Sequence, residues 1–441
     1  MFINKFASLI QKKTEFLYEN SLILQNIDKL TGILIFSVFI LAAFVSSDVI
    51  GAVECSVIFL SLIKLFVKKG EKLEFNCFDT ILILFLMIVL ISVAGSSLLL
   101  LSIKGVLKTL TYTGFYFSCV YYFKNHKNQI LPLFLVLCGC LTFESIAGLV
   151  QNYVKIGEIS GWQDISSLNP EQVMTRVYGT LKPYNPNLLC GYFISAISAL
   201  YGLFAYYFFI EKKKRMSVIL ISASLLTTIT MLLTGCRGGY MGWFAIVCTI
   251  LAISYKFIKP ELKKLYYKIL GGIAVLSASF ITFYLPLRTR ILSIFAFRND
   301  SSNSFRFNVY HSCIEMFKDN WLLGIGVGNL NFREIYGLYM LSGFDALSAY
   351  NIYLETAVES GIFALISFIS FLGLVLYKGF RFIFNSDNAK DIILVSTAVV
   401  SIIGMMIHGM VDTVFFRPQI QTNFWLMIAV IRVLTDKNDN L

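Results

Sequence analysis

Twelve apolar runs separated by polar segments limit the folds open to this chain. A helix of about 20 residues crosses the ~30 Å hydrocarbon core of a bilayer, and helices satisfy their own backbone hydrogen bonds in lipid. The pattern therefore predicts an all-α polytopic integral membrane protein. The expected spans are residues 31–46, 49–67, 79–96, 105–123, 129–150, 188–210, 216–234, 239–255, 269–285, 347–374, 391–411 and 419–434.

Composition supports this fold class. The chain is 57% hydrophobic and only 14% charged, too little charge for the surface of a soluble protein of 441 residues. The net charge of +11 does not indicate nucleic-acid binding, because the charges lie in short runs between apolar segments, as in cytoplasmic loops. We expect one membrane domain over residues 1–441. The nine cysteines lack zinc-site spacing, so no metal is expected.

The lysines and arginines gather on alternate connections between the runs, which sets the expected orientation. We expect a multi-pass protein of the cell inner (plasma) membrane with both termini in the cytoplasm. Two long connections, 151–187 and 286–346, then lie outside. The second is expected to be partly helical, with Asn303 or Ser304 as an N-cap, and the third span is expected to break near residues 95–97.

The segment LLTGCRGGYMGW, residues 232–243, places Arg237 beside Gly238 and Gly239 at an outer turn. An arginine at this depth is costly unless it faces a polar cavity or an anion, and glycines allow a ligand close approach to the backbone. These residues suit a lipid-linked phosphate or diphosphate. The alternative is an arginine that reaches the headgroups, with glycines for a tight turn.

Other polar residues fall on the same outer side. The first long connection ends in TRVYGTLKPYNPNLLCGYF, where Asn187 can cap a helix. Together these residues predict a cationic outer cavity for an anionic ligand. The residues concerned are Arg176, Asn185, Asn187, Arg306, Asn329, His408, Asp412 and Arg417.

The tenth span begins with two carboxylates on one helical face. Glu355 and Glu359 are four residues apart, and Asn351 shares their face, just after Tyr350. A carboxylate inside a span should face protein or water, and one could accept a proton. The alternative is a hydrogen-bond partner between helices. His311 in the second long connection is expected to be an inert surface residue.

The order of these motifs resembles the O-antigen ligase/polymerase superfamily. The likeness runs over about residues 160–430: Arg176-x-x-Gly179-Thr180, Asn185-Pro186-Asn187, Thr234-x-x-Arg237-Gly238-Gly239, Gly324-x-Gly326-x-Gly328-Asn329 and Asn351-x-Tyr353-Leu354-x-x-x-x-Glu359. The resemblance implies a GT-C type glycosyltransferase of the cell envelope, with a large outer loop. Such enzymes move glycans from undecaprenyl diphosphate to an acceptor, without a metal or other cofactor. Arg237 and Arg306 match the positions expected to hold the diphosphate, and Arg176 is assigned with them.

Within the superfamily the chain is most similar to the cyanobacterial inorganic-carbon (bicarbonate) transporter branch. The likeness rests on Gly161-Trp162, TRVYGTLKPYNPNLLCGYF, FRNDSSNSFRFNVY and LSAYNIYLETAVESG. One position departs from the ligases, which typically carry histidine where this chain has Tyr350. Tyrosine is a poor base at neutral pH, so the candidates for accepting a proton are Tyr350, Glu355, Glu359 and Asp345.

Two other functions remain open on the sequence. An anion transporter would also favour arginines, but it needs a polar route across the membrane. The chain has few polar residues at mid-depth outside the tenth span, which favours the enzyme. A non-catalytic scaffold for envelope assembly is the third possibility.

Overall fold

The computed structural model describes residues 2–159 and 174–436, which are almost entirely helical. The helices are α1 (Phe2–Asn20), α2 (Leu22–Gln25), α3 (Ile27–Leu41), α4 (Ser47–Val67), α5 (Cys77–Ser92), α6 (Leu99–Asn125), α7 (Ile130–Tyr153), α8 (Pro186–Ala205), α9 (Lys214–Leu233), α10 (Arg237–Phe257), α11 (Lys263–Phe283), α12 (Leu285–Leu292), α13 (Ser301–Asp319), α14 (Asn329–Tyr336), α15 (Ile352–Asn385), α16 (Ala389–His408) and α17 (Pro418–Thr435). Two short strands, β1 (Glu158–Ile159) and β2 (Thr175–Arg176), pair antiparallel.

A helix lies at each of the twelve expected spans, so the prediction of an all-α polytopic protein is confirmed. Within the described residues, nine helices are long and apolar enough to cross a membrane: α4, α5, α7, α8, α9, α10, α11, α15 and α16. The other three expected spans are α3, α6 and α17. Of these, α3 has only 15 residues, whereas α6 and α17 carry polar side chains.

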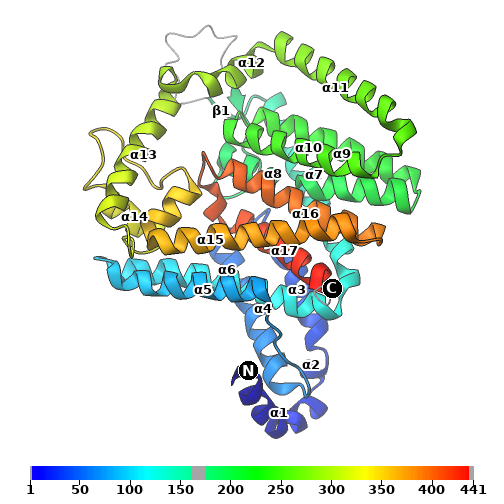
Figure 1. Ribbon diagram of the computed structural model, residues 1–441, viewed down its shortest axis with the longest axis vertical. Coiled ribbons are helices and arrows are strands. Elements are labelled where there is room, and N and C mark those ends of the chain that lie inside the picture. Colours follow the sequence, from blue (N-terminus) through cyan, green and yellow to red (C-terminus); the bar gives the residue numbers. More distant parts are fainter. Residues whose placement is uncertain (1, 160–173, 437–441) are drawn as a thin grey trace.

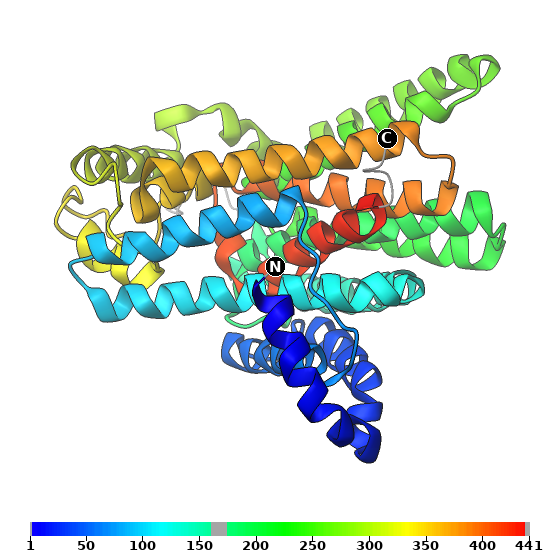
Figure 2. The same ribbon diagram turned by 60° about the horizontal axis from the view of Figure 1, so that its bottom comes forward.

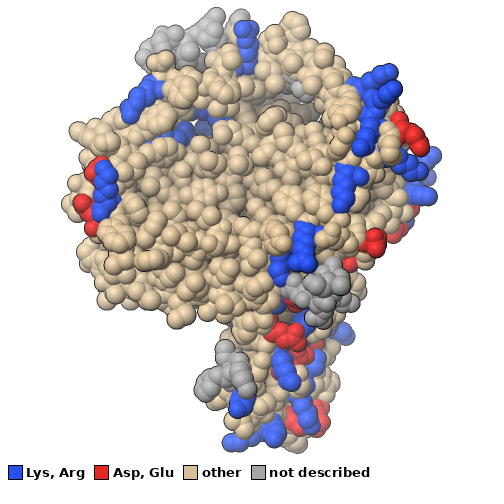
Figure 3. All heavy atoms as spheres, viewed as in Figure 1, with Lys and Arg blue, Asp and Glu red and all other residues tan. Residues whose placement is uncertain are grey.

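The long helices run side by side, and α13 and α14 cover one end of the bundle (Figures 1 and 2). We call this the cavity end, and the end where α17 finishes the opposite end. The N-terminal helices project from the side of the bundle in Figure 1. Figure 3 shows a broad face without charged side chains, with charges at its edges, as expected of a surface in contact with lipid.

Helix α17 is the centre of the bundle, and every residue from Pro418 to Thr435 is buried. Its polar side chains bond neighbouring helices: Asn423 Nδ2 donates to Ser195 Oγ at 2.8 Å, and Thr422 Oγ1 donates to Glu54 Oε1 at 3.0 Å. Such bonds join helices where the surrounding lipid offers no hydrophobic driving force between them.

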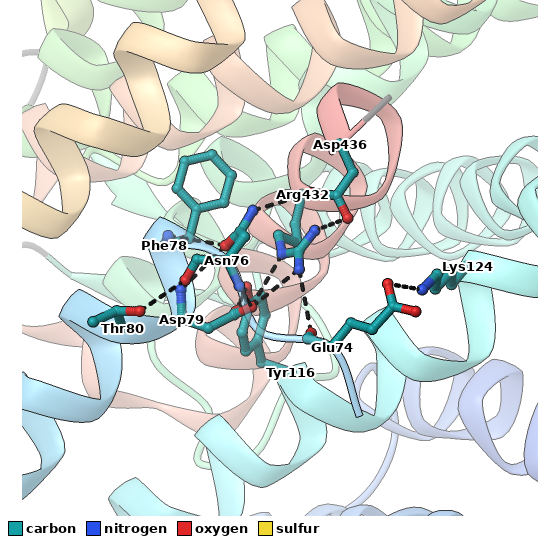
Figure 4. Close-up of polar contacts among 9 residues, drawn as sticks. All are labelled: Glu74, Asn76, Phe78, Asp79, Thr80, Tyr116, Lys124, Arg432 and Asp436. Carbon is teal, nitrogen blue, oxygen red and sulfur yellow. Dashed lines mark hydrogen bonds and ion pairs between the residues drawn. The ribbon is translucent and has the colours of Figure 1, made fainter. Parts of the chain in front are cut away.

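At the opposite end, Arg432 of α17 is neutralised by two carboxylates (Figure 4). Its Nε and Nη2 donate to Asp79 Oδ2 at 3.2 and 3.1 Å, and its Nη1 pairs with Asp436. The hydroxyl of Tyr116 donates to the other oxygen of Asp79 at 2.9 Å. Asn76 caps α5 beside this group, in a capping box with Asp79. The network fixes α17 to the beginning of α5.

Three expectations about helix ends can be compared with the structure, and one of them is confirmed. The third span ends at Ser92, followed by a single 3-10 turn to Gly95, so the expected break is confirmed. The N-cap of α13 is Asp300 rather than Asn303 or Ser304. The tenth span begins five residues late, at Ile352, and is broken at Gly361, whose φ of 79° is favourable only for glycine.

Candidate functional site

A cavity of about 730 Å³ opens at the cavity end of the bundle. Its walls come from the first turns of α4, α10, α15 and α17, from α5, α6, α12 and α13, and from the segments that precede α14 and α17. Part of the lining is aromatic and includes Phe85, Phe368, Phe424 and Trp425. Phe85 and Phe368 have ring centroids 5.8 Å apart, and Phe424 and Trp425 have theirs 5.1 Å apart.

Arg237 is the first residue of α10, and its guanidinium lies at the wall of this cavity. It is 9% exposed, and its Nη1 lies 2.8 Å from Asp300 Oδ1 and donates to Ser293 Oγ at 3.0 Å. Asp300 therefore neutralises Arg237, a partner that the sequence analysis did not anticipate. The contacts of Arg237 use only Nη1, so within the described chain Nε and Nη2 keep donors for a ligand.

Arg306 comes from α13 and lines the cavity beside Tyr350. Its Nε donates to Val411 O at 3.0 Å and its Nη1 to Ser302 Oγ at 2.8 Å. The guanidinium carbon lies 5.7 Å from the centroid of the Tyr350 ring. Neutral partners hold Arg306 in place without cancelling its charge.

Arg176, at the end of β2, lines the cavity and belongs to a hydrogen-bonded network of polar groups. Its Nε donates to Thr234 O at 2.7 Å and its Nη2 bonds Asn187 Oδ1. Asn187 Nδ2 then donates to Asp412 Oδ2 at 3.0 Å. The expected N-cap role belongs to Asn185, whose Oδ1 accepts from Asn187 N, so Asn187 itself is free to connect Arg176 with Asp412.

A fourth arginine, Arg290 of α12, was missed by the sequence analysis. Its Nε donates to Gly235 O at 2.9 Å, in the turn that precedes Arg237. Burial, together with the nearby charges of Arg176 and Arg237, lowers the pKa of Arg290 to about 10. Four guanidinium groups thus lie around one cavity, and the carboxylates in direct contact with them are fewer than the arginines themselves.

The two carboxylates of α15 both line the cavity but make different contacts. Glu355 Oε2 accepts from Ala349 N at 3.1 Å, and its other oxygen has no partner within the described residues. Glu359 Oε1 accepts from Gly328 N at 3.0 Å and so holds the glycine-rich segment 324–328. The same segment bonds the backbone of α15, with Ile325 N donating to Val358 O at 2.9 Å.

Tyr350 lines the cavity in a left-handed conformation with φ of 51°, which is uncommon outside glycine and is often found at functional sites. Burial and the nearby charge of Asp412 raise the pKa of Tyr350. Its hydroxyl therefore keeps its proton at neutral pH, and less phenolate is available as a base than from a free tyrosine.

Twelve of the residues singled out in the sequence line this one cavity: Arg176, Asn185, Asn187, Arg237, Gly238, Arg306, Asn329, Tyr350, Glu355, Glu359, Asp412 and Arg417. The cavity does not include Gly239 or Asn351. A Cβ at Gly239 would lie 2.0 Å from Cys190 Sγ, so this glycine allows α10 to approach α8. Asn351 is the N-cap of α15, and its side chain accepts from Tyr353 N and Leu354 N.

Other candidates lie away from the cavity. His311 is exposed, and Asp345 forms a surface ion pair with Arg333 at 2.9 Å. Lys108, which the sequence analysis did not single out, also lines the cavity. Gly161 and Trp162 fall outside the described residues.

One group within the described residues could hold a metal ion, and no sequence spacing indicated it. Cys236, His408 and Asp412 are buried, and one ligand atom from each lies within 4.8 Å of the others. The three residues come from the turn before α10, the end of α16 and the turn before α17.

Comparison with known proteins agrees with the resemblance seen in the motifs. Residues 222–369 match the family model described as O-Antigen ligase. The matched stretch holds Arg237, Arg290, Arg306 and the two carboxylates of α15, and therefore much of the cavity wall. No curated protein matches the chain. The match supports an O-antigen-ligase-like membrane protein, and it does not bear on the transporter branch.

Proposed function

We propose that this chain is a membrane glycosyltransferase that moves a glycan from a polyprenyl (undecaprenyl) diphosphate carrier to a glycan or lipid acceptor. We place the reaction at the outer face of the inner (plasma) membrane, with both termini in the cytoplasm. The observation that carries the proposal is the cluster of Arg176, Arg237, Arg290 and Arg306 around one cavity at the end of the bundle. Guanidinium groups bind phosphate oxygens through paired, charge-assisted hydrogen bonds.

In the proposed reaction the acceptor hydroxyl attacks the anomeric carbon, and the bond from that carbon to the diphosphate breaks. The departing diphosphate takes the electron pair and gains negative charge. Arginines already held in place by Asp300, Val411 O and Gly235 O stabilise this charge without rearranging. The positive charge of the cavity arginines thus lies where the reaction develops negative charge on the departing diphosphate.

Glu355 is our candidate for the group that accepts the proton of the acceptor hydroxyl. One of its oxygens is held by Ala349 N–H, which fixes the carboxylate, and the other is available at the cavity wall. Glu359 binds Gly328 N–H and is assigned a positioning role for the glycine-rich segment. Tyr350 is assigned a contact role, because its pKa is raised rather than lowered.

The carrier lipid needs an apolar surface next to the phosphate site. The aromatic side chains of the cavity lining supply such a surface for the first isoprene units; they are Phe85, Phe368, Phe424 and Trp425. The lining of the cavity reaches only about halfway along α15 and α17, and at the opposite end α17 is fixed to α5 through Arg432. This shape favours a reaction at one face over passage of bicarbonate across the membrane.

A transfer assay in proteoliposomes tests the proposal. We would supply undecaprenyl-diphosphate-linked glycans from the source cell and compare the wild type with Arg306→Gln. Arg298→Gln is the matched control, because Arg298 lies on the same loop but is exposed and outside the cavity. We expect Arg306→Gln to lose about 10²–10³-fold in rate, and the control to keep the wild-type rate.

Two results would overturn the proposal: a carrier that stays loaded with wild-type protein, or equal rates for both variants. Accumulation of labelled bicarbonate in the same vesicles would establish the transporter instead.

The role of Glu355 has its own matched pair of variants. We expect Glu355→Gln to lower the transfer rate by about 10²–10⁴-fold, the range of general base catalysis. Glu359→Gln keeps a carbonyl oxygen that can accept from Gly328 N–H, so its rate should stay near that of wild type. Equal loss in both variants would exclude Glu355 as the particular proton acceptor.

A further inference from the structure

Next to the arginine cluster are three side chains that the proposed transfer does not use: Cys236 precedes Arg237, His408 contacts Cys236, and Asp412 bonds Asn187, the partner of Arg176. Cys236 is the N-cap residue of α10, His408 is the last residue of α16, and Asp412 precedes α17. They are 3%, 3% and 4% exposed. Cys236 Sγ lies 3.6 Å from His408 Nε2, which is the contact that the His408 ring makes within the described chain.

We propose that Cys236, His408 and Asp412 hold a divalent transition-metal ion of the Zn²⁺ class. Zinc binds thiolate sulfur at about 2.3 Å, imidazole nitrogen at about 2.0 Å and carboxylate oxygen at about 2.1 Å. Tetrahedral coordination at these lengths separates two ligand atoms by about 3.3–3.8 Å. The observed 3.6 Å between sulfur and nitrogen lies in this range, and all three ligand atoms lie within 4.8 Å.

The charges of the group suit a divalent cation despite the nearby arginines. A thiolate and a carboxylate neutralise the ion, so an occupied site adds no net charge beside Arg237. The carboxylate of Asp412 is already oriented: Asn187 Nδ2 donates to one oxygen and Val414 N to the other, at 3.0 and 3.1 Å. Each oxygen keeps a second lone pair, and such outer contacts are typical of metal-binding carboxylates.

The group can be reached from the main cavity, which Cys236 and Asp412 line. His408 and Asp412 also border a separate void of about 10 Å³, which Cys236 does not border. Three protein ligands with the fourth position open to the main cavity would resemble the open zinc sites that bind water or a substrate oxygen.

Cys190 provides a matched control. A Cβ at Gly239 would lie 2.0 Å from Cys190 Sγ and 3.7 Å from Cys236 Sγ, so the two thiols lie close to one point on α10. Cys190, however, does not belong to the group whose ligand atoms all lie within 4.8 Å of each other. Replacing this thiol changes the same buried environment and leaves the proposed ligands in place.

The test is metal content of the full-length protein purified in detergent. After removal of bound metal with a chelator, Zn²⁺ is added, excess is removed, and zinc is measured by mass spectrometry. We expect about one zinc ion per chain for the wild type and for Cys190→Ser, and below about one tenth of that for Cys236→Ser and His408→Ala. Co²⁺ in the same site should give a thiolate-to-metal absorption band that Cys236→Ser abolishes.

Thermal unfolding of each variant checks that loss of zinc is not loss of the fold. A wild type that retains no zinc would overturn the proposal, as would equal retention by wild type and Cys236→Ser. Retention lost in Cys190→Ser as strongly as in Cys236→Ser would also overturn the ligand set. None of these readouts depends on glycan transfer, so the metal site and the proposed function can fail separately.

Discussion

Arginines are buried at both ends of the bundle, but their partners differ. At the opposite end, Arg432 contacts Asp79 and Asp436, so two carboxylates surround one guanidinium. At the cavity end, four arginines share one ion pair, between Arg237 and Asp300, within the described residues. Backbone carbonyls and neutral side chains complete the other contacts there. The charge of Arg432 is therefore neutralised within the fold, whereas the cavity arginines retain positive charge that can bind a ligand.

The largest expected effect is on stability, at the opposite end. Replacing Arg432 by Met leaves Asp79 and Asp436 without their cation, and breaking a buried pair from one side costs about 3–5 kcal/mol. Thermal unfolding in detergent should show this loss, while the transfer rate per folded molecule stays at the wild-type value. A variant as stable as wild type would contradict the assignment of Arg432 to the fold.

At the cavity end, Arg290→Gln should lower the transfer rate with little effect on stability. Within the described residues Arg290 makes one side-chain hydrogen bond, to Gly235 O, and its pKa is lowered to about 10 by burial and by other arginines. Its removal relieves repulsion, so we expect little loss of stability. The transfer rate should fall by about 10²-fold, the cost of one donor at a developing charge. Full activity would exclude Arg290 from the site.

Asp300→Asn is expected to act in the opposite direction, because it should strengthen ligand binding instead of lowering activity. Asn caps helices about as well as Asp, so α13 keeps its N-cap while Arg237 loses its carboxylate. The freed charge should strengthen binding of inorganic diphosphate by a few-fold, measured by titration calorimetry. Binding that stays the same or weakens would show that Asp300 does not compete with the ligand for Arg237.

Tyr350→Phe should have the smallest effect. Because the pKa of Tyr350 is raised by burial and by Asp412, its phenol stays protonated through the neutral range. The transfer rate of Tyr350→Phe should follow that of the wild type from about pH 6 to 9. A limb of the pH profile that disappears in this variant would make Tyr350 a proton acceptor after all.

The helices could be predicted because each apolar run carries its own signal. The span at α17 was predicted, but its central place in the bundle could not be, since Gln419, Gln421 and Asn423 give its sequence a polar character that is unusual for the most buried helix. Asn423 and Thr422 find partners on other helices, Ser195 and Glu54, and those pairs exist only in the folded bundle. Likewise an isolated glycine in an apolar run gives no sign that Gly361 interrupts α15.

The site was predictable where a motif brought several residues together, as in the segment around Arg237 and the start of α15. Arg290 and Asp300 were missed because each acts on a residue more than fifty positions earlier in the chain. The possible metal ligands were missed for the same reason: Cys236 lies far in sequence from His408 and Asp412, and no spacing rule connects them.

The break at Gly361 determines where two carboxylates point. A Cβ there would lie 2.2 Å from Leu322 O, so another residue would push α15 away from the chain just before the glycine-rich segment. Just before the break, Val358 and Glu359 of α15 are bonded to Ile325, Gly326 and Gly328, and the helix is thus held on this side of Gly361 by the glycine-rich segment. In a continuous helix each residue turns the face by about 100°. One glycine thus allows the acidic face to be oriented independently of the membrane-spanning part that follows it.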